Sequence, residues 1–205
     1  MKRICVLLVI FCFLSIVRAD EREIKSGLKV IINWASTEYG NSPSANANME
    51  TKLMLGLGVF VDLFRISDTL SIQPELNIIM KGRGFNDGSW RELYYLELPL
   101  LLKLAFPIKG SWITNVYGLF GPYGALSMGG AQSDGVKHKV GTGWWDLSRF
   151  EGGILICAGV QIFHVAKMEV GYGYGLTNIW GDPGHKEKNR DLYLSFRIPD
   201  PLRFL

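Results

Sequence analysis

The sequence predicts an all-β fold, an eight-stranded antiparallel up-and-down transmembrane β-barrel at residues 20–205, preceded by a cleavable signal peptide at residues 1–19. Three observations lead to this prediction. Apolar and polar residues alternate with a period of two over long segments, as strands with two different faces require. The segments between them are alternately long and short, and no segment after residue 19 approaches the roughly 18 apolar residues of a membrane-spanning helix.

The first 19 residues have the three parts of a secretory signal peptide. Lys2 and Arg3 supply the basic start, Ile4–Leu14 is an apolar run, and Val17–Ala19 places small residues where a signal peptidase cleaves. A membrane anchor is the alternative, but the apolar run is short for a spanning helix. We therefore expect secretion across the inner membrane.

Removing this segment changes the charge. Of the 22 basic residues, Lys2, Arg3 and Arg18 lie within it, whereas all 19 acidic residues follow it, which leaves 19 basic and 19 acidic residues. A neutral chain does not favour nucleic acid as a partner. Cys157 becomes the single cysteine, so neither a disulfide nor a thiolate metal site can form, and no cofactor is expected.

The clearest alternation spans residues 69–106. Even positions carry Leu70, Ile72, Pro74, Leu76, Ile78, Met80, Leu96, Leu98, Leu100, Leu102 and Leu104. The opposite face carries Glu75, Glu97 and Lys103. Strands in soluble sheets usually have about 5–6 residues, whereas these runs approach the roughly 9–11 that cross a bilayer. The leucine rows are therefore expected to face lipid and the charged residues the lumen.

Six further strands are expected along the chain. They are residues 27–34, 51–64, 111–128, 149–163, a segment from about 166 to 177, and 191–198. In the second, Leu53, Leu55, Leu57, Val59, Val61 and Leu63 are expected on the lipid face. Apolar residues of 111–128 occupy both parities, so the pattern does not assign its faces.

The connections set the expected orientation. Segments 35–50, 82–91, 129–148 and 178–190 are the longer ones and are expected outside, while turns near 65–68, 107–110 and 164–165 are expected in the periplasm with both termini. Aromatic residues near the strand ends suit a membrane girdle. Those expected at the outer ends are Trp34, Trp90, Tyr94, Tyr174 and Trp180, and those at the inner ends are Phe64, Phe106, Trp112 and Phe163. A secreted soluble barrel that encloses an apolar ligand is the alternative.

Several blocks of sequence resemble the PorT-like outer-membrane β-barrel proteins of Gram-negative bacteria. They are Pro74-Glu75-Leu76 with Lys81-Gly82, the run Tyr95–Lys103, Tyr117–Gly124, Gly152-Gly153 with Gly159-Val160, and Tyr172–Asn178. The resemblance implies an eight-stranded barrel in the outer membrane, and some members of this family take part in protein secretion. The chain departs from the pattern by continuing past the last strand at Pro199–Leu205.

The lumen of an eight-stranded barrel is just wide enough for side chains to fill. Charged residues there should pair, because an unpaired buried charge is costly. We expect a structural network rather than an ion path, formed by Glu75, Lys81, Glu97, Lys103, Glu151, Lys167, Glu169 and Arg197, with Lys29, Asp62 and Asp191 also on lumen faces. Glu75 and Glu97 are expected to lie against Lys81, Lys103 or Arg197.

No catalytic, cofactor or metal residue is expected. The histidines, His138, His164 and His185, fall in connections, away from any serine on a strand face, so a lipid-modifying enzyme is the less favoured alternative. Asp182, His185 and Glu187 read as a solvated loop rather than a metal site.

The connections are therefore the expected functional surface. His138, Trp144 and Trp145 are the candidates for contact with a ligand or partner, although the tryptophans could simply anchor the loop at the membrane interface. The expected partners are outer-membrane lipid and other envelope or secretion proteins, in a structural, interaction or secretion-related role.

Overall fold

The computed structural model describes residues 25–40, 49–67, 69–143, 146–163, 166–181 and 186–199. Eight long strands account for most of these residues. They are β1 (Lys25–Tyr39), β3 (Lys52–Asp62), β5 (Leu70–Phe85), β6 (Trp90–Pro107), β7 (Ile113–Gln132), β9 (Phe150–Ile162), β10 (Ala166–Gly175) and β11 (Glu187–Pro199). Three short strands extend them, β2 (Met49–Glu50), β4 (Phe64–Arg65) and β8 (Lys137–His138).

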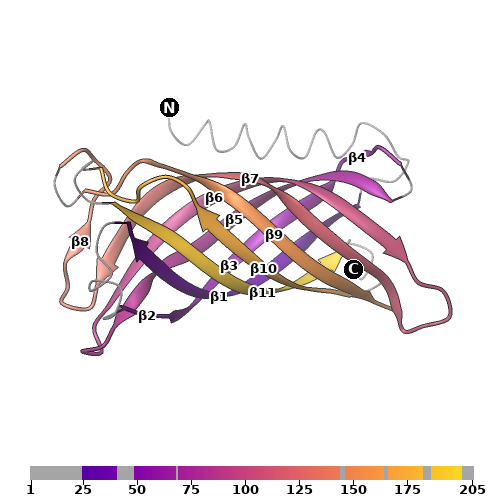
Figure 1. Ribbon diagram of the computed structural model, residues 1–205, viewed down its shortest axis with the longest axis horizontal. Coiled ribbons are helices and arrows are strands. Elements are labelled where there is room, and N and C mark those ends of the chain that lie inside the picture. The colour runs from indigo at the N-terminus through magenta and orange to yellow at the C-terminus, as the bar shows by residue number, and fades with distance from the viewer. Residues whose placement is uncertain are drawn as a thin grey trace.

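The long strands form one closed antiparallel barrel, as predicted. Each pairs with its neighbours in chain order, and β1 closes the circle by pairing with β11 from Gly27↔Pro199 to Tyr39↔Glu187. The strands run obliquely around a long axis, with β2 and β8 at one end and β4 at the other (Figure 1). These are called the β2 end and the β4 end below. The part of the chain that the structure describes holds no helix long and apolar enough to span a bilayer.

The outward faces carry a continuous apolar belt. Leu57 is 64% exposed and Leu100 54% exposed, whereas Glu75 and Glu97 are buried inside. The belt consists of Leu28, Val30, Leu53, Leu55, Leu57, Ile78, Leu98, Leu100, Leu102, Leu104, Phe120, Ile156, Val170, Leu192, Phe196 and Ile198. Since the leucine rows lie outside, the soluble barrel with an apolar calyx is ruled out, and the belt is the surface that lipid covers.

Strand β7 is the one whose faces the sequence pattern left open. Tyr117, Leu119 and Tyr123 are buried inside the barrel, while Phe120 and Met128 are more than half exposed on its wall. Both faces are apolar because β7 itself contributes aromatic and aliphatic side chains to the lumen, and the charged groups that these side chains contact come from other strands. This explains why alternation alone does not assign the strand.

The predicted facing of β3 holds up to its β4 end. Leu53, Leu55 and Leu57 face outward as expected. Phe60 and Asp62 point into the lumen, where the Lys167 amino group contacts both of them. The pairing with β1 runs without a register shift from Lys25↔Asp62 to Ala35↔Lys52, so Val61 stays on the outward face although its side chain is buried.

The connections at the β2 end are shorter than predicted. Segments 35–50, 82–91 and 178–190 were expected as loops, but β1 continues to Tyr39, β5 to Phe85, and β11 begins at Glu187. Their polar residues belong to strands that continue beyond the apolar belt, where both faces can be polar. Polarity alone therefore does not distinguish a loop from such a strand.

The turn between β5 and β6 is tight. Gly88 has a φ of 81°, a backbone conformation that glycine adopts readily. The amide and hydroxyl of Ser89 both donate hydrogen bonds to Asp87, at 2.9 and 2.6 Å, and they lower the pKa of this exposed carboxyl. The segment 82–91, expected as an outside loop, is thus mostly strand with a four-residue turn.

Glycines of the lumen wall lie opposite buried tyrosines. Gly171 pairs with Tyr193 across β10 and β11, and Gly159 pairs with Tyr117 across β9 and β7. Gly153 and Tyr123 repeat the arrangement between the same two strands, β9 and β7. A Cβ at Gly171 would come within 2.3 Å of the Tyr193 ring. The missing side chains make room for rings that cross the narrow lumen.

Replacing Gly171 with alanine is expected to lower the free energy of unfolding by about 1–3 kcal/mol, because the added methyl group overpacks the Tyr193 ring. Urea titration of the barrel in lipid vesicles measures this. Gly124→Ala is the control, since an added Cβ there would meet nothing within 4 Å. Equal stability of the two variants would contradict the role given to the glycine.

Candidate functional site

The lumen is the chemically distinct part of the molecule. The structure places all eight predicted network residues inside it, each at most 7% exposed. Together with residues at the β2 end, the described chain directs seven basic and seven acidic side chains inward, so their formal charges cancel. The basic ones are Lys29, Lys81, Arg83, Arg91, Lys103, Lys167 and Arg197, and the acidic ones are Asp62, Glu75, Glu97, Glu151, Glu169, Glu187 and Asp191.

The first cluster joins four strands around Glu75. Its carboxylate accepts from Lys29 Nζ at 2.8 Å and from Arg197 Nη2 at 2.6 Å. Arg197 also pairs with Glu169, which accepts a hydrogen bond of 2.9 Å from the Tyr117 hydroxyl. β5, β1, β11 and β10 are thus linked across the lumen by two cations and two carboxylates. Glu75 lies against Arg197, one of its three expected partners.

The second cluster surrounds Lys81. Its amino group lies 2.8 Å from Glu97, 3.1 Å from Glu151 and 3.5 Å from Asp191. Three carboxylates would suit a metal ion, but the Lys81 ammonium occupies the position of the cation. Among the described residues, no group of His, Cys, Asp and Glu is arranged to hold a metal ion.

The third cluster lies at the β4 end. Lys103 donates a hydrogen bond of 2.7 Å to Asp62, and Lys167 lies 3.7 Å from the same carboxylate oxygen. Lys103 was a possible partner of Glu75 or Glu97, but Asp62 is its ion-pair partner here. The reason is position, since Asp62 and Lys103 both lie near the strand ends at the β4 end.

Glu187 holds the lumen together at the β2 end. Its carboxylate accepts hydrogen bonds from Thr37 at 2.6 Å, from the Trp180 indole at 2.6 Å and from Arg91. Arg83 lies 3.5 Å from it. Four elements therefore converge on one carboxylate, which is fully buried.

Connections fold over this end and close it. The His138 and Trp180 rings pack in a T-shaped arrangement with centroids 5.5 Å apart, and the Leu147 backbone forms isolated β-bridges to both Val140 and Trp180. Leu147, Ile179 and Trp180 are each at most 3% exposed. The expected placement of Trp180 in the membrane girdle is therefore wrong, because Glu187 holds its indole inside the barrel.

The remaining predicted contact residues divide into two groups. His138 is 8% exposed and lies beneath the connections rather than on their outer surface. Trp144 and Trp145 lie outside the described residues, as do His164, Asp182, His185 and the segment 1–19. The lumen arrangement thus describes a site built to fix structure, and the Ser195 hydroxyl, which donates a hydrogen bond of 3.0 Å to the Glu169 carboxylate, is fully buried within it.

Sequence reasoning missed Arg83, Arg91 and Glu187 because they fall in segments expected as loops. The alternation of the neighbouring strands nevertheless indicates that these three residues face inward. Arg83 continues the inward parity of Glu75 and Lys81, Arg91 has the parity of Glu97, and Glu187 has that of Asp191. Extending each alternation by two to four residues would have placed all three in the lumen.

Comparison with known proteins agrees with this architecture. Residues 19–181 match the family model described as an outer membrane protein beta-barrel domain. No curated protein sequence matches the chain.

Solved barrels with low sequence identity are similar in fold. The neisserial surface protein A is 12% identical, with 85% of this chain and 96% of that one covered and a TM-score of 0.49. Ail of Yersinia pestis, in complex with the heparin analogue sucrose octasulfate, is 10% identical, with 86% and 99% covered and a TM-score of 0.45. OprG of Pseudomonas aeruginosa is 13% identical, with 86% and 91% covered and a TM-score of 0.37.

The family model covers most of the chain, and the exposed apolar belt is the surface that such a protein presents to lipid. The chain therefore belongs to the family of outer-membrane proteins built on this β-barrel domain and resides in the outer membrane of a Gram-negative bacterium.

Proposed function

We propose that this protein is a non-enzymatic barrel with a structural or interaction role, whose lumen is a fixed polar core and whose β2 end faces outside. The observation that carries the proposal is the pairing of the lumen charges across the barrel, with Glu187 and the connections closing the β2 end. A lumen filled in this way supports the barrel and the surfaces it carries rather than a flow of solutes.

Conductance in planar lipid bilayers tests this function. The purified barrel is expected to insert without producing ion-channel steps, because the lumen side chains are held by the ion pairs described above. Glu187→Gln weakens the contacts to Arg91 and Arg83 and is therefore a more sensitive variant for the same conductance measurement. The other three charge clusters are expected to keep this variant folded. Steady conductance by the unmodified protein would contradict the proposal.

The proposed topology places both termini in the periplasm and residues 1–19 in a removed signal peptide. Three of the four connections at the β2 end, those between β1 and β3, β7 and β9, and β10 and β11, are longer than any connection at the β4 end, which supports it because short turns characterise the periplasmic side. N-terminal sequencing of the protein from isolated outer membranes, expected to begin at Asp20, tests the cleavage site.

A PorT-like identity is a finer proposal, supported by blocks of sequence that serve the lumen. Glu75 and Glu97 come from two of these blocks, and Gly153 and Gly159 from another make room for Tyr123 and Tyr117. A secretion-related role follows from this resemblance. Deleting the gene and comparing the secreted proteins with those of a complemented strain tests it.

A further inference from the structure

Two arginines lie opposite each other inside the barrel at its β2 end. Arg83 on β5 and Arg91 on β6 are direct cross-strand partners, and both side chains point into the lumen, where the residues are 4% and 3% exposed. Like charges placed directly opposite each other on a sheet are destabilising, and burial strengthens their repulsion. The pair therefore needs negative charge close to both guanidinium groups.

Glu187 supplies one negative charge to this pair. Its Oε1 pairs with Arg91 and lies 3.5 Å from Arg83 Nη1. Oε1 also accepts a hydrogen bond from Thr37, and Oε2 accepts one from Trp180, so both carboxylate oxygens are engaged. Among the described residues, no second carboxylate pairs with either guanidinium. Two cations and one anion leave one positive charge uncompensated.

Three nitrogens of the arginine pair have no hydrogen-bond partner among the described residues. They are Nε and Nη1 of Arg83 and Nε of Arg91, and all three are buried. Arg83 Nη2 is engaged, since it donates a hydrogen bond of 3.2 Å to the Tyr39 hydroxyl. A guanidinium carries donors and no acceptor, and a buried donor without a partner costs free energy. Unengaged donors and excess positive charge in one place both favour an anion.

Aromatic rings enclose the pair and limit the size of such an anion. The guanidinium carbon of Arg83 lies 4.9 and 4.4 Å from the ring centres of Tyr39 and Phe85. That of Arg91 lies 4.8 Å from the Trp180 ring centre. Because side chains also fill the lumen of an eight-stranded barrel, only a small ion fits here.

The neighbouring charges limit the ion to a single negative charge. Lys81 lies two positions before Arg83 on the same face of β5, and three carboxylates surround its one ammonium group. This excess of negative charge opposes a dianion such as sulfate close by. A monovalent ion compensates the charge that Glu187 leaves and adds no further charge to the lumen.

We propose that a small monovalent anion, of the size of chloride, binds beside Arg83 and Arg91 in the closed β2 end of the lumen. It accepts hydrogen bonds from Nε of both arginines and from Nη1 of Arg83. The ion is a structural ligand that completes the charge balance around Glu187. This site goes beyond the proposed function and does not depend on which side the β2 end faces.

The experiment uses the purified full chain folded in detergent micelles, with sodium gluconate exchanged for sodium chloride at constant ionic strength. The line width of the chloride NMR signal reports the bound ion directly. Urea titration reports the stabilisation that a ligand of the native state produces. The unmodified protein is expected to broaden the chloride signal and to unfold at a higher urea concentration in chloride than in gluconate.

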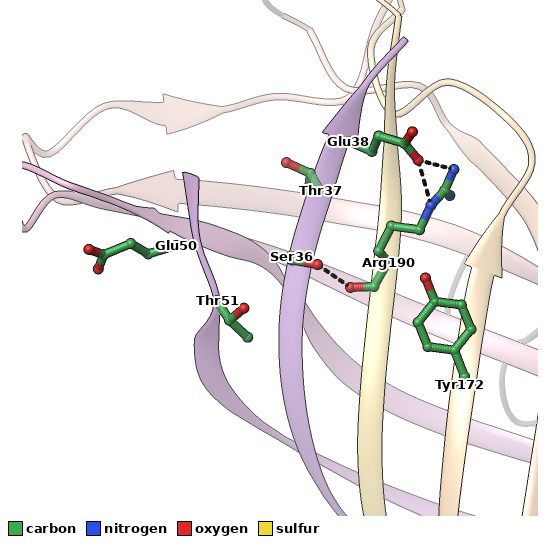
Figure 2. Close-up of a pocket in the computed structure, with 7 residues that line it drawn as sticks. All are labelled: Ser36, Thr37, Glu38, Glu50, Thr51, Tyr172 and Arg190. Carbon is green, nitrogen blue, oxygen red and sulfur yellow. Dashed lines mark hydrogen bonds and ion pairs between the residues drawn. The ribbon is translucent and has the colours of Figure 1, made fainter. Parts of the chain in front are cut away.

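Arg83→Met removes one positive charge and two of the unengaged donors, so it is expected to weaken chloride binding about tenfold, or about 1.4 kcal/mol. Arg190→Met is the matched control, because the donors of Arg190 are engaged. Its Nε donates to Glu38 at 2.9 Å and its Nη2 lies 2.6 Å from the same carboxylate (Figure 2). Its Nη1 donates to the carbonyl oxygens of Gly175 and Asn189. This variant is expected to bind chloride like the unmodified protein.

Glu187→Gln changes the affinity in the opposite direction. It keeps both arginines and removes the negative charge between them, so it is expected to bind chloride more tightly than the unmodified protein. This gain keeps the test decisive if Arg83→Met does not fold, since a loss of structure does not raise affinity.

Three results would overturn the inference. The first is equal chloride binding by Arg83→Met and Arg190→Met, which places the ion elsewhere. The second is chloride binding by Glu187→Gln that is no tighter than that of the unmodified protein. The third is an unmodified protein that neither broadens the chloride signal nor gains stability in chloride, which shows that water alone meets the arginine donors.

Discussion

Replacing Glu75 with leucine is expected to lower the free energy of unfolding by about 3–5 kcal/mol, because it leaves two buried cations short of a partner. Glu75 is 1% exposed and neutralises both Lys29 and Arg197. Leucine has a similar volume, so the loss reports charge rather than a cavity. Urea titration in lipid vesicles, followed by tryptophan fluorescence and by the heat-dependent shift in gel mobility, measures it.

A second substitution tests whether the loss comes from the ion pair. Glu75→Leu with Arg197→Met removes both partners, and an apolar pair of similar volume is often tolerated. The double variant is therefore expected to be more stable than the sum of the single losses predicts, by at least about 1 kcal/mol. Strict additivity would show that Glu75 and Arg197 act independently.

Replacing Leu98 with lysine is expected to cost about 2–4 kcal/mol, as a cation does on the lipid face near the middle of a membrane. Leu98 is 45% exposed near the midpoint of β6, within the apolar belt. Phe106→Lys is the control, because Phe106 is 57% exposed near the β4 end of the same strand. There the cost should fall to about 0–1 kcal/mol.

Folding yields of both variants into vesicles provide the measurement, with urea titration of the folded fraction. Depth along the strand is the variable that differs between the two sites. If Leu98→Lys and Phe106→Lys are equally stable, the belt does not span the bilayer as described.

The period of two predicted most of the wall and its two faces. In residues 70–80 and 96–104 every second side chain is apolar, and strand geometry alone sends those side chains to one side. The charged residues of the opposite parity, such as Glu75 and Lys103, were expected inside the barrel. The reason is that the apolar rows are longer than the strands of soluble sheets. The pattern could not assign β7, where Tyr117 and Leu119 fill the lumen with apolar groups.

The ion-pair and hydrogen-bond partners of the lumen residues could not be predicted from the alternation of the sequence. Alternation gives the face of a residue, but its height along the barrel depends on how the strands are staggered. Lys103 therefore pairs with Asp62 instead of Glu75, and Glu187 gathers Arg91 and Thr37, which lie 96 and 150 residues away in the chain. The ion pair of Glu38 and Arg190 has the same origin, since these residues are 152 residues apart in the chain.

The seam between β1 and β11 joins the first and last strands, and it has a consequence for the kinetics of folding. Lys29 lies on β1 and Arg197 on β11, while their shared carboxylate, Glu75, comes from β5. These contacts have a high sequence separation, so the entropy of closing the chain must be paid before any of them forms. A barrel in which β1 and β11 have not yet paired holds unpaired buried charges and is therefore unstable. We expect barrel closure to be the slow step of folding, and the native state to become stable only once this seam has formed.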